Sequence, residues 1–167
     1  MNSYNTNHNE YANEASVTTE SQVFYTPSIK IYTYPDAKMP TISTQGSGGL
    51  DLFVYDYKVE DHQTTVFTGA HVEIPLGHVG LVMPRSSTGT KGFRLKNTVG
   101  VIDADYRGEI RLVCDRFENE EDVVEVGAKI AQLVILPVCP FPVEQVSSLE
   151  DLSETERGAN GFGSTGL

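Results

Sequence analysis

Apolar residues in this chain recur mostly at every second position, in short runs that Gly, Pro and polar clusters interrupt. Alternation of this kind puts one face of a strand in a core and the other in solvent, and many short runs between turns are typical of all-β folds. Helical periodicity is almost absent, and residues 148–155 allow one helical turn at most. The pattern predicts an all-β barrel or jelly roll. Its clearest strands are expected at residues 28–32, 50–54, 71–74, 79–83 and 129–136.

Residues 97–108 set a β-branched run against a sharply polar turn. Residues 99–102 suit a pleated, half-buried surface, glycines bracket the acidic segment 103–106, and alternation resumes at Ile110. The pattern predicts a β-hairpin with carboxylates and an aromatic ring near its tip.

Such a hairpin has two possible chemical uses. Its backbone can pair with the edge of a flat polar ligand while Tyr106 supplies a platform. A carboxylate at the tip can orient and deprotonate a water molecule. The alternative is that Asp103 and Asp105 merely suit a turn and that Tyr106 packs, since acidic residues are common in turns.

The ends and loops of the chain differ from its centre in composition. Residues 1–24 are rich in Asn, Ser and Thr, which predicts a disordered tail ahead of a domain over residues 25–155. Residues 156–167 are Gly-rich, with one Phe and one Arg, and are interpreted either as a disordered tail or as a lid. The polar composition of residues 55–63 predicts a solvated surface loop. This loop or the N-terminal tail is a candidate contact for a protein partner. Residues 85–92 predict a polar loop.

The formal net charge is −11. Such a chain repels polyphosphate backbones, so nonspecific nucleic-acid binding is not expected, whereas a small anionic ligand remains possible if Arg residues or a divalent cation reverse the local field. The N-terminus has no secretory pattern and no stretch has the length of a membrane span. We therefore expect a soluble cytoplasmic protein without a membrane partner, or one in the host cytoplasm if the chain is viral.

Isolated reactive side chains give little further direction. Cys114 and Cys139 lie in apolar runs, which predicts buried free thiols and leaves a disulfide open. The histidines lack metal-ligand spacing, and His71 is expected to face outward from a strand. Ser86 and Ser87 have no neighbouring His–Asp pattern, which disfavours a serine nucleophile.

Five stretches, taken in order, resemble the five motifs of the homotrimeric deoxyuridine triphosphatases (dUTPases). They are residues 49–52, 84–87, 97–108, 127–133 and 157–166, and residues 35–41 also resemble the start of that family. The resemblance implies a distorted jelly-roll barrel whose C-terminal arm is exchanged between the subunits of a homotrimer. It also implies an enzyme, dUTP diphosphatase, that hydrolyses dUTP to dUMP and pyrophosphate with Mg²⁺. That reaction keeps uracil out of DNA and supplies dUMP for dTMP synthesis.

The resemblance carries roles over to individual residues. Asp103 would activate the water that attacks the α-phosphorus, and Asp51 matches the aspartate associated with the metal, through water. Tyr106 would stack under the deoxyribose and exclude a 2′-hydroxyl. The groups that would recognise uracil are the Asn97 side chain and the backbone of Gly100, Val101, Ile102 and Arg111.

The remaining predicted site residues would handle the phosphates. The groups expected to approach or hold them are Arg85, Ser86, Ser87, Gln132, Arg157, Gly163, Ser164 and Thr165. Phe162 would close over the uracil ring.

Two alternatives follow from departures and relatives of this family. Ser87, Leu50 and Asn160 differ from the residues most frequent in the motifs, which affects the expected local backbone geometry. A dCTP deaminase, or a bifunctional deaminase, shares the fold but carries a catalytic Glu five residues after the glycine at 108, where this chain has Val113. A catalytically weak relative that acts as a regulatory or binding module is the non-enzymatic alternative.

Overall fold

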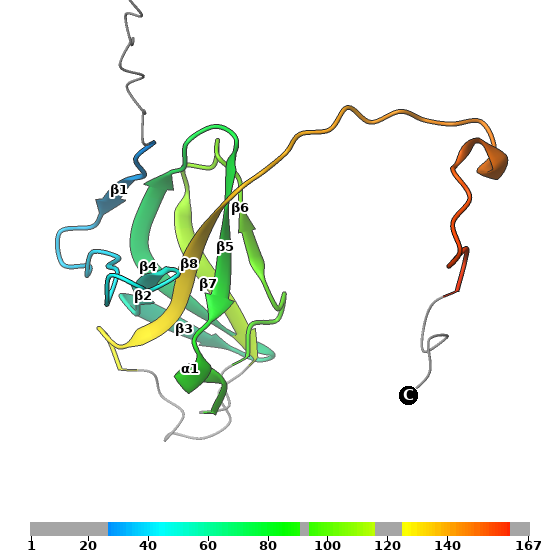
Figure 1. Cartoon of the computed structure of the whole chain (residues 1–167). Helices are drawn as coiled ribbons and strands as arrows, with labels where there is room; N and C mark the ends of the chain where they lie inside the picture. Colours follow the sequence, from blue (N-terminus) through cyan, green and yellow to red (C-terminus); the bar gives the residue numbers. More distant parts are fainter. Residues whose placement is uncertain (1–26, 91–93, 116–124, 161–167) are drawn as a thin grey trace, which may run out of the picture.

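The computed structural model describes residues 27–90, 94–115 and 125–160 and consists of two four-stranded antiparallel sheets packed against each other (Figure 1). The first sheet holds β1 (Lys30–Thr33), β3 (Asp56–Glu60), β4 (Gln63–Glu73) and β7 (Glu109–Asp115). The second holds β2 (Leu50–Phe53), β8 (Lys129–Pro137), β5 (His78–Pro84) and β6 (Gly100–Ile102), paired in that order. The all-β prediction is confirmed.

The core lies between the two sheets because each contributes one apolar face to it. On β7 the residues alternate between buried and exposed from Ile110 to Asp115, with Leu112 and Cys114 on the buried side. Leu52 and Leu133 face them from the second sheet, both fully buried. Two-residue periodicity therefore specifies which side of each strand meets the core.

Strand β4 is the longest and forms the centre of the first sheet. Its register with β7 shifts between Phe67 and His71, and three consecutive residues, Thr68 to Ala70, are buried there. Gly69 has a φ of 65° and its missing side chain leaves room for Ala37, so a residue with a Cβ would be strained and would clash. This β-bulge bends β4 beside the connection between β6 and β7.

The predicted hairpin at residues 97–114 is wrong in its pairing, although both strands exist. Strand β6 pairs with β5, through Gly80 and Ile102 among others, and β7 pairs with β4 in the other sheet. No ladder joins β6 to β7 in the described part of the chain. Six residues separate the two strands, which is enough for the chain to cross from one sheet to the other, whereas a tight hairpin turn has about two.

Two predicted loops are regular structure. Residues 56–60 form β3, which makes a hairpin with β4 through the pair Glu60 and Gln63, and β4 starts eight residues before the expected strand at 71. Residues 86–90 form the short helix α1 (Ser86–Thr90) instead of a loop. Strand β3 exposes Val59 beside Asp56 and Lys58, whereas α1 exposes Ser86, Ser87 and Gly89. Thr88 attaches α1 by donating from its hydroxyl to the carbonyl of Ile130 (3.0 Å).

One side-chain prediction is wrong and another is confirmed in part. Both cysteines are free, but only Cys114 is buried, because Cys139 follows the end of β8 on an exposed segment. Burial, with a smaller contribution from the charge of Asp115, raises the pKa of the Cys114 thiol to about 12. His71 lies on the side of β4 opposite the core residue Val72, as expected, but its ring is half-buried because it packs against Tyr32 and Tyr34, and its Nε2 atom is buried without a hydrogen-bond partner.

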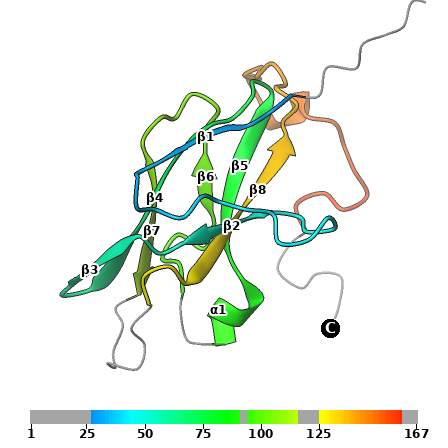
Figure 2. The same cartoon turned by 90° about the vertical axis from the view of Figure 1, so that its left-hand side faces the viewer.

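After β8 the chain leaves the barrel as an extended segment, residues 138–160, here called the C-terminal arm (Figures 1 and 2). It includes the single 3-10 turn η2 (Leu149–Asp151), within the range expected for one helical turn. Large apolar side chains on the arm are exposed, with Phe141 81% and Val143 98% accessible. The predicted N-terminal tail, residues 1–24, lies outside the described residues.

Candidate active site

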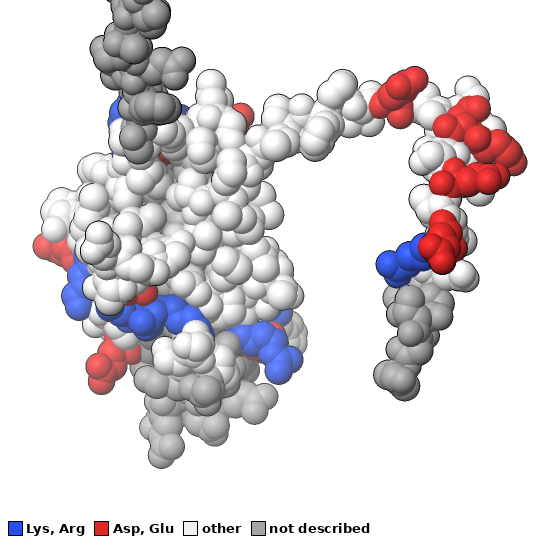
Figure 3. All heavy atoms as spheres, viewed as in Figure 1, with Lys and Arg blue, Asp and Glu red and all other residues white. Residues whose placement is uncertain are grey.

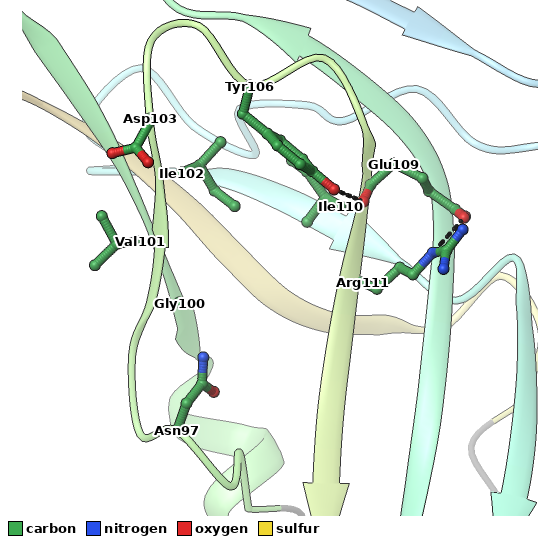
Figure 4. Close-up of a pocket in the computed structure, with 9 residues that line it drawn as sticks. All are labelled: Asn97, Gly100, Val101, Ile102, Asp103, Tyr106, Glu109, Ile110 and Arg111. Carbon is green, nitrogen blue, oxygen red and sulfur yellow. Dashed lines mark hydrogen bonds and ion pairs between the residues drawn. The ribbon is translucent and has the colours of Figure 1, made fainter.

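A pocket of about 260 Å³ opens where β6 and β7 diverge (Figure 4). A volume somewhat below the roughly 300–1,000 Å³ of common ligand pockets suits one planar ring and part of a sugar. Seven of the predicted site residues line it, together with Glu109 and Ile110. The seven are Asn97, Gly100, Val101, Ile102, Asp103, Tyr106 and Arg111.

The β6 side of the pocket is a sheet edge. In the described chain β6 pairs on one side only, with β5, so its other side presents backbone N–H and C=O groups to the pocket. Thr98, with a φ of 61°, turns the chain just ahead of β6 and brings the Asn97 amide beside Gly100. The edge and the amide together can pair with the donors and acceptors of a flat heterocycle.

Tyr106 is held over the opposite side of the pocket. Its hydroxyl donates to the carbonyl of Glu109 (3.0 Å), and its backbone N–H donates to the carbonyl of Asp103 (3.1 Å). The ring lies so close to Gly108 that any Cβ there would collide with it. Arg107 stiffens the same turn by donating from Nη1 to the carbonyls of Ala104 (2.7 Å) and Tyr106 (2.8 Å). The ring is therefore fixed before any ligand arrives.

Asp103 lies at the end of β6 and is exposed. Because successive side chains alternate along a strand, it projects on the same side as Val101 and away from Ile102 (Figure 4). Val101 is 62% accessible, so this side of the strand is open to water. A solvated carboxylate next to the pocket can accept a proton from a water molecule.

A second cluster of predicted residues lies on the second sheet. Asp51 lies on β2 and forms two ion pairs, from Oδ1 to Arg85 Nε (2.9 Å) and from Oδ2 to Lys129 Nζ (2.7 Å). It also accepts a hydrogen bond from the Ser43 hydroxyl. Burial raises the pKa of the Asp51 carboxyl, but the hydrogen bonds from Lys129 and Ser43 and the charges of Arg85 and Lys129 outweigh it, so the pKa is lowered overall. Asp51 thus stays ionised and fixes Arg85 in place.

Gln132 belongs to the same region, since it pairs across the ladders with both Asp51 and Met83 and donates from Nε2 to the carbonyl of Pro84 (3.2 Å). Ser86 and Ser87 begin α1 directly after Arg85. Basic side chains gather on the lower part of the barrel in this view (Figure 3). The arrangement can receive an anionic group that extends from the pocket.

Arg157 is not brought to the pocket within the described chain. It lies exposed near the end of the C-terminal arm and donates from Nε to the carbonyl of Asn160 (2.8 Å). The arm carries five acidic residues from 138 to 160, and Arg157 is its one basic residue (Figure 3). The predicted residues Phe162, Gly163, Ser164 and Thr165 lie outside the described residues.

Within the described ranges, no three His, Cys, Asp or Glu side chains form a group that could hold a metal ion. Mg²⁺ often keeps several waters and binds through one or two carboxylates plus substrate phosphates, so a complete protein cage is not required. Asp51 is the ionised carboxylate of the basic cluster, and an ion held through water would share its two oxygens with Arg85 and Lys129, which already contact them. None of the helices in the described chain has the length and apolarity needed to cross a membrane.

Sequence reasoning missed three residues that support the site. Glu109 lines the pocket, Lys129 neutralises Asp51, and Thr88 attaches the helix that follows Arg85. Glu109 follows the turn at Gly108 directly, but Arg111 and Asp115 in the same strand are also charged, so its charge alone does not single it out. The partners of the other two are remote in sequence, so no local pattern indicates them.

Comparison with known proteins gives the class of protein. The barrel is similar to the solved structure of the Staphylococcus bacteriophage 80alpha dUTPase with dUPNHPP, with a TM-score of 0.71 and 27% identity, covering 85% of this chain and 100% of that one. The fold is therefore the β jelly-roll type of the dUTPases.

Sequence comparison agrees. A family model described as dUTPase matches residues 35–166. The deoxyuridine 5′-triphosphate nucleotidohydrolase of Hydrogenobaculum sp. (strain Y04AAS1) is 42% identical over 136 residues, which cover 79% of this chain and 92% of the relative. That of Escherichia phage T5 is 37% identical over 143 residues, covering 80% and 95%. The chain belongs to the dUTPase family, and the prediction of a hydrolase of nucleotide metabolism is confirmed at the level of this family.

Proposed function

We propose that the protein hydrolyses dUTP to dUMP and pyrophosphate, with Asp103 as the catalytic carboxylate. The observation that carries this proposal is the unpaired edge of β6, which faces the Tyr106 ring across a pocket of about 260 Å³, with the exposed carboxylate of Asp103 lining the same pocket at the end of the strand. It combines a surface that can pair with a pyrimidine edge and a base that can activate water.

In the proposed reaction the base lies against the backbone of β6 and the Asn97 amide. The deoxyribose stacks on Tyr106, whose fixed position leaves no space for a 2′-hydroxyl. Asp103 accepts a proton from a water molecule while the water oxygen bonds to the α-phosphorus. The bond between this phosphorus and the bridging oxygen to the β-phosphorus breaks, and pyrophosphate leaves with the electron pair.

The phosphates extend toward the cluster that contains Arg85 and Gln132. Guanidinium groups bind phosphate oxygens in two-point contacts, and the backbone and hydroxyls of Ser86 and Ser87 add donors. When bound, Mg²⁺ supplies neutralisation of charge on the phosphates and on the leaving pyrophosphate. Asp51 would hold the ion through water, which agrees with its ionised state.

We further propose a homotrimer in which the C-terminal arm completes the site of another subunit. The arm leaves the barrel and exposes Phe141 and Val143, which need an apolar partner surface. Arg157 and residues 162–165 would then reach the phosphates and cover the base in that neighbouring site. In the cell, the cytoplasmic reaction would lower dUTP, keeping uracil out of DNA, and supply dUMP for dTMP synthesis.

The test is pyrophosphate release by the full chain in the presence of Mg²⁺, with dUTP, dCTP, dTTP and UTP compared at equal concentration. We expect turnover with dUTP to exceed that with each of the others by at least about tenfold. Ammonia release from dCTP would instead indicate a deaminase. Tight binding of a non-hydrolysable dUTP analogue without release of pyrophosphate from dUTP would indicate a binding module.

A further inference from the structure

Glu109 is a buried carboxylate that the proposed reaction does not use. Its side chain is 4% accessible at the start of β7, where it lines the pocket. An ionised carboxylate in such a position is costly unless hydrogen-bond donors surround it. The hydrogen-bond partners of the Glu109 carboxylate therefore indicate what keeps a charged group at this buried position.

The two carboxylate oxygens of Glu109 have separate partners. Oε1 accepts a hydrogen bond from the backbone N–H of Gly69 (2.8 Å), and Oε2 accepts one from Arg111 Nε (3.1 Å; Figure 4). The Arg111 guanidinium lies over the Phe67 ring, 5.2 Å from its centroid. Gly69 is at the bulge of β4, where the register shift frees its N–H from the ladder with β7. The carboxylate thus joins the bulge to the side chain of Arg111.

The bulge makes two further contacts with the same wall of the pocket. The Thr68 hydroxyl donates to the carbonyl of Ile110 (2.7 Å), and His71 Nδ1 lies 2.9 Å from the carbonyl of Arg107, so Nδ1 carries the hydrogen. The main chain of Glu109 in turn accepts the hydrogen bond from the Tyr106 hydroxyl. Through these hydrogen bonds, Thr68, Gly69 and His71 hold the segment 107–111 in place.

We infer that Glu109 is a positioning residue for nucleotide recognition, an inference that rests on the proposed function. Its carboxylate transmits the geometry of the β4 bulge to the wall opposite β6. It sets the distance between the β6 edge and the Tyr106 ring, and with that the space available at the 2′ position of the sugar. Its loss should affect binding and sugar discrimination more than the chemical step, because Asp103 is on the other strand.

The experiment compares Glu109→Gln with Glu60→Gln in the full chain. Glutamine keeps an acceptor for the Gly69 N–H but presents an amide donor where Arg111 Nε also donates. Glu60 is a matched control, since its carboxylate also accepts from one cation, Lys58, and one neutral donor, Gln63, on the exposed β3–β4 hairpin. The measurements are kcat and KM for dUTP and UTP, and the melting temperature.

For Glu109→Gln we expect KM for dUTP to rise about tenfold and kcat to change less than about twofold. The preference for dUTP over UTP should fall about fivefold. Glu60→Gln should match the wild type in all of these. A Glu109→Gln protein with a lower melting temperature but wild-type KM and wild-type preference would overturn the inference, because that result describes a purely structural residue.

Arg111→Met is the second variant, chosen because the Arg111 side chain is 57% accessible and methionine retains packing on Phe67. It should raise KM for dUTP about threefold to tenfold, and Glu109→Gln should add less in this background than alone. Wild-type KM and preference in Arg111→Met would also contradict the inference. A wild-type protein that releases no pyrophosphate from dUTP would defeat the proposed function and this inference together, whereas an active wild type with unaffected variants would defeat only the inference.

Discussion

The pocket proposed for the base and the cluster proposed for the phosphates are assembled in different ways. The pocket comes from one continuous stretch, residues 97–111, backed by the bulge of β4. The phosphate-side residues come from separate parts of the chain: Asp51 on β2, Arg85 after β5, Gln132 on β8 and Arg157 on the C-terminal arm. The first region is complete in one chain, whereas Arg157, which we propose for the phosphate side, belongs to an arm that extends away from the barrel (Figure 1).

The difference corresponds to the way each region is stabilised. Hydrogen bonds within the turn fix Tyr106 and the β6 edge before binding, so little ordering entropy remains to be lost there. On the phosphate side, Arg85 and Lys129 are held by Asp51, a charge of the protein itself. Under the proposed function, a triphosphate must compete with that carboxylate or bring a cation. We therefore expect a rigid binding site for the base and a phosphate site that forms only when this competition is overcome.

The largest expected effect is a loss of turnover, without a loss of binding, when Asp103 is replaced. Asp103→Asn keeps the shape of the pocket but removes the proton acceptor, so kcat for dUTP should fall about 10³-fold. Binding of dUpNHpp, measured by calorimetry, should stay within about twofold of wild type. Near-normal turnover in this variant would remove Asp103 from the proposed role.

The next prediction tests whether the phosphate side is completed in trans. Arg157→Ala should lower kcat/KM for dUTP about 10-fold to 100-fold, because a charge-assisted contact with a phosphate is lost. Asp103→Asn and Arg157→Ala chains are then denatured together, refolded and assayed. If the arm serves another subunit, mixed trimers contain some sites with both residues intact and activity returns; if the arm folds onto its own site, every site keeps one defect and mixing restores nothing.

The rigidity of the base pocket is tested at Gly108. Gly108→Ala places a Cβ against the Tyr106 ring and should displace it, reducing the preference for dUTP over UTP about tenfold. Gly46→Ala is the matched control, because a Cβ there meets nothing within 4 Å. Competition kinetics with the two nucleotides provide the measurement. An unchanged preference in Gly108→Ala would show that the position of the ring does not decide the choice of sugar.

The smallest expected effect is on stability. Because the folded-state pKa of Asp51 lies below its ordinary value of 3.8, its contribution is present above about pH 4 and is lost as pH falls through the folded value. Asp51→Asn should lower the free energy of unfolding by about 1–3 kcal/mol at pH 7 and by less at pH 3. Urea unfolding at fixed protein concentration measures both values. A difference that does not change with pH would contradict the assignment of charge to Asp51.

Sequence predicted the parts of this molecule that depend on local pattern. Alternation located β1, β2, β5 and β8, and the segment 97–111 supplied most of the pocket because its contributing residues are neighbours in the chain. Pattern did not give strand partners, so β6 and β7 were expected to pair although they lie in different sheets. Strand β3 was missed although Asp56 to Glu60 alternate between polar and apolar residues, because the polar character of the whole segment 55–63 was interpreted as a solvated loop.

The bulge at Gly69 and the role of Glu109 could not be predicted either. A bulge arises from a register shift between strands, and neither strand shows it alone. The contact between Gly69 and Glu109 joins residues forty positions apart. The Asp51 cluster was predicted in part, since Asp51, Arg85 and Gln132 belong to the motifs that resemble the family, while Lys129 as the partner of Asp51 depends on the ladder between β2 and β8.

A crystal structure of the full chain with dUpNHpp and Mg²⁺ tests the central claim most directly. We predict that the uracil ring is hydrogen-bonded to the backbone of β6 from Gly100 to Ile102, with the sugar on Tyr106. One water molecule should bridge the Asp103 carboxylate and the α-phosphorus. A base bound outside the gap between β6 and β7, or an Asp103 carboxylate remote from the α-phosphate, would contradict the account.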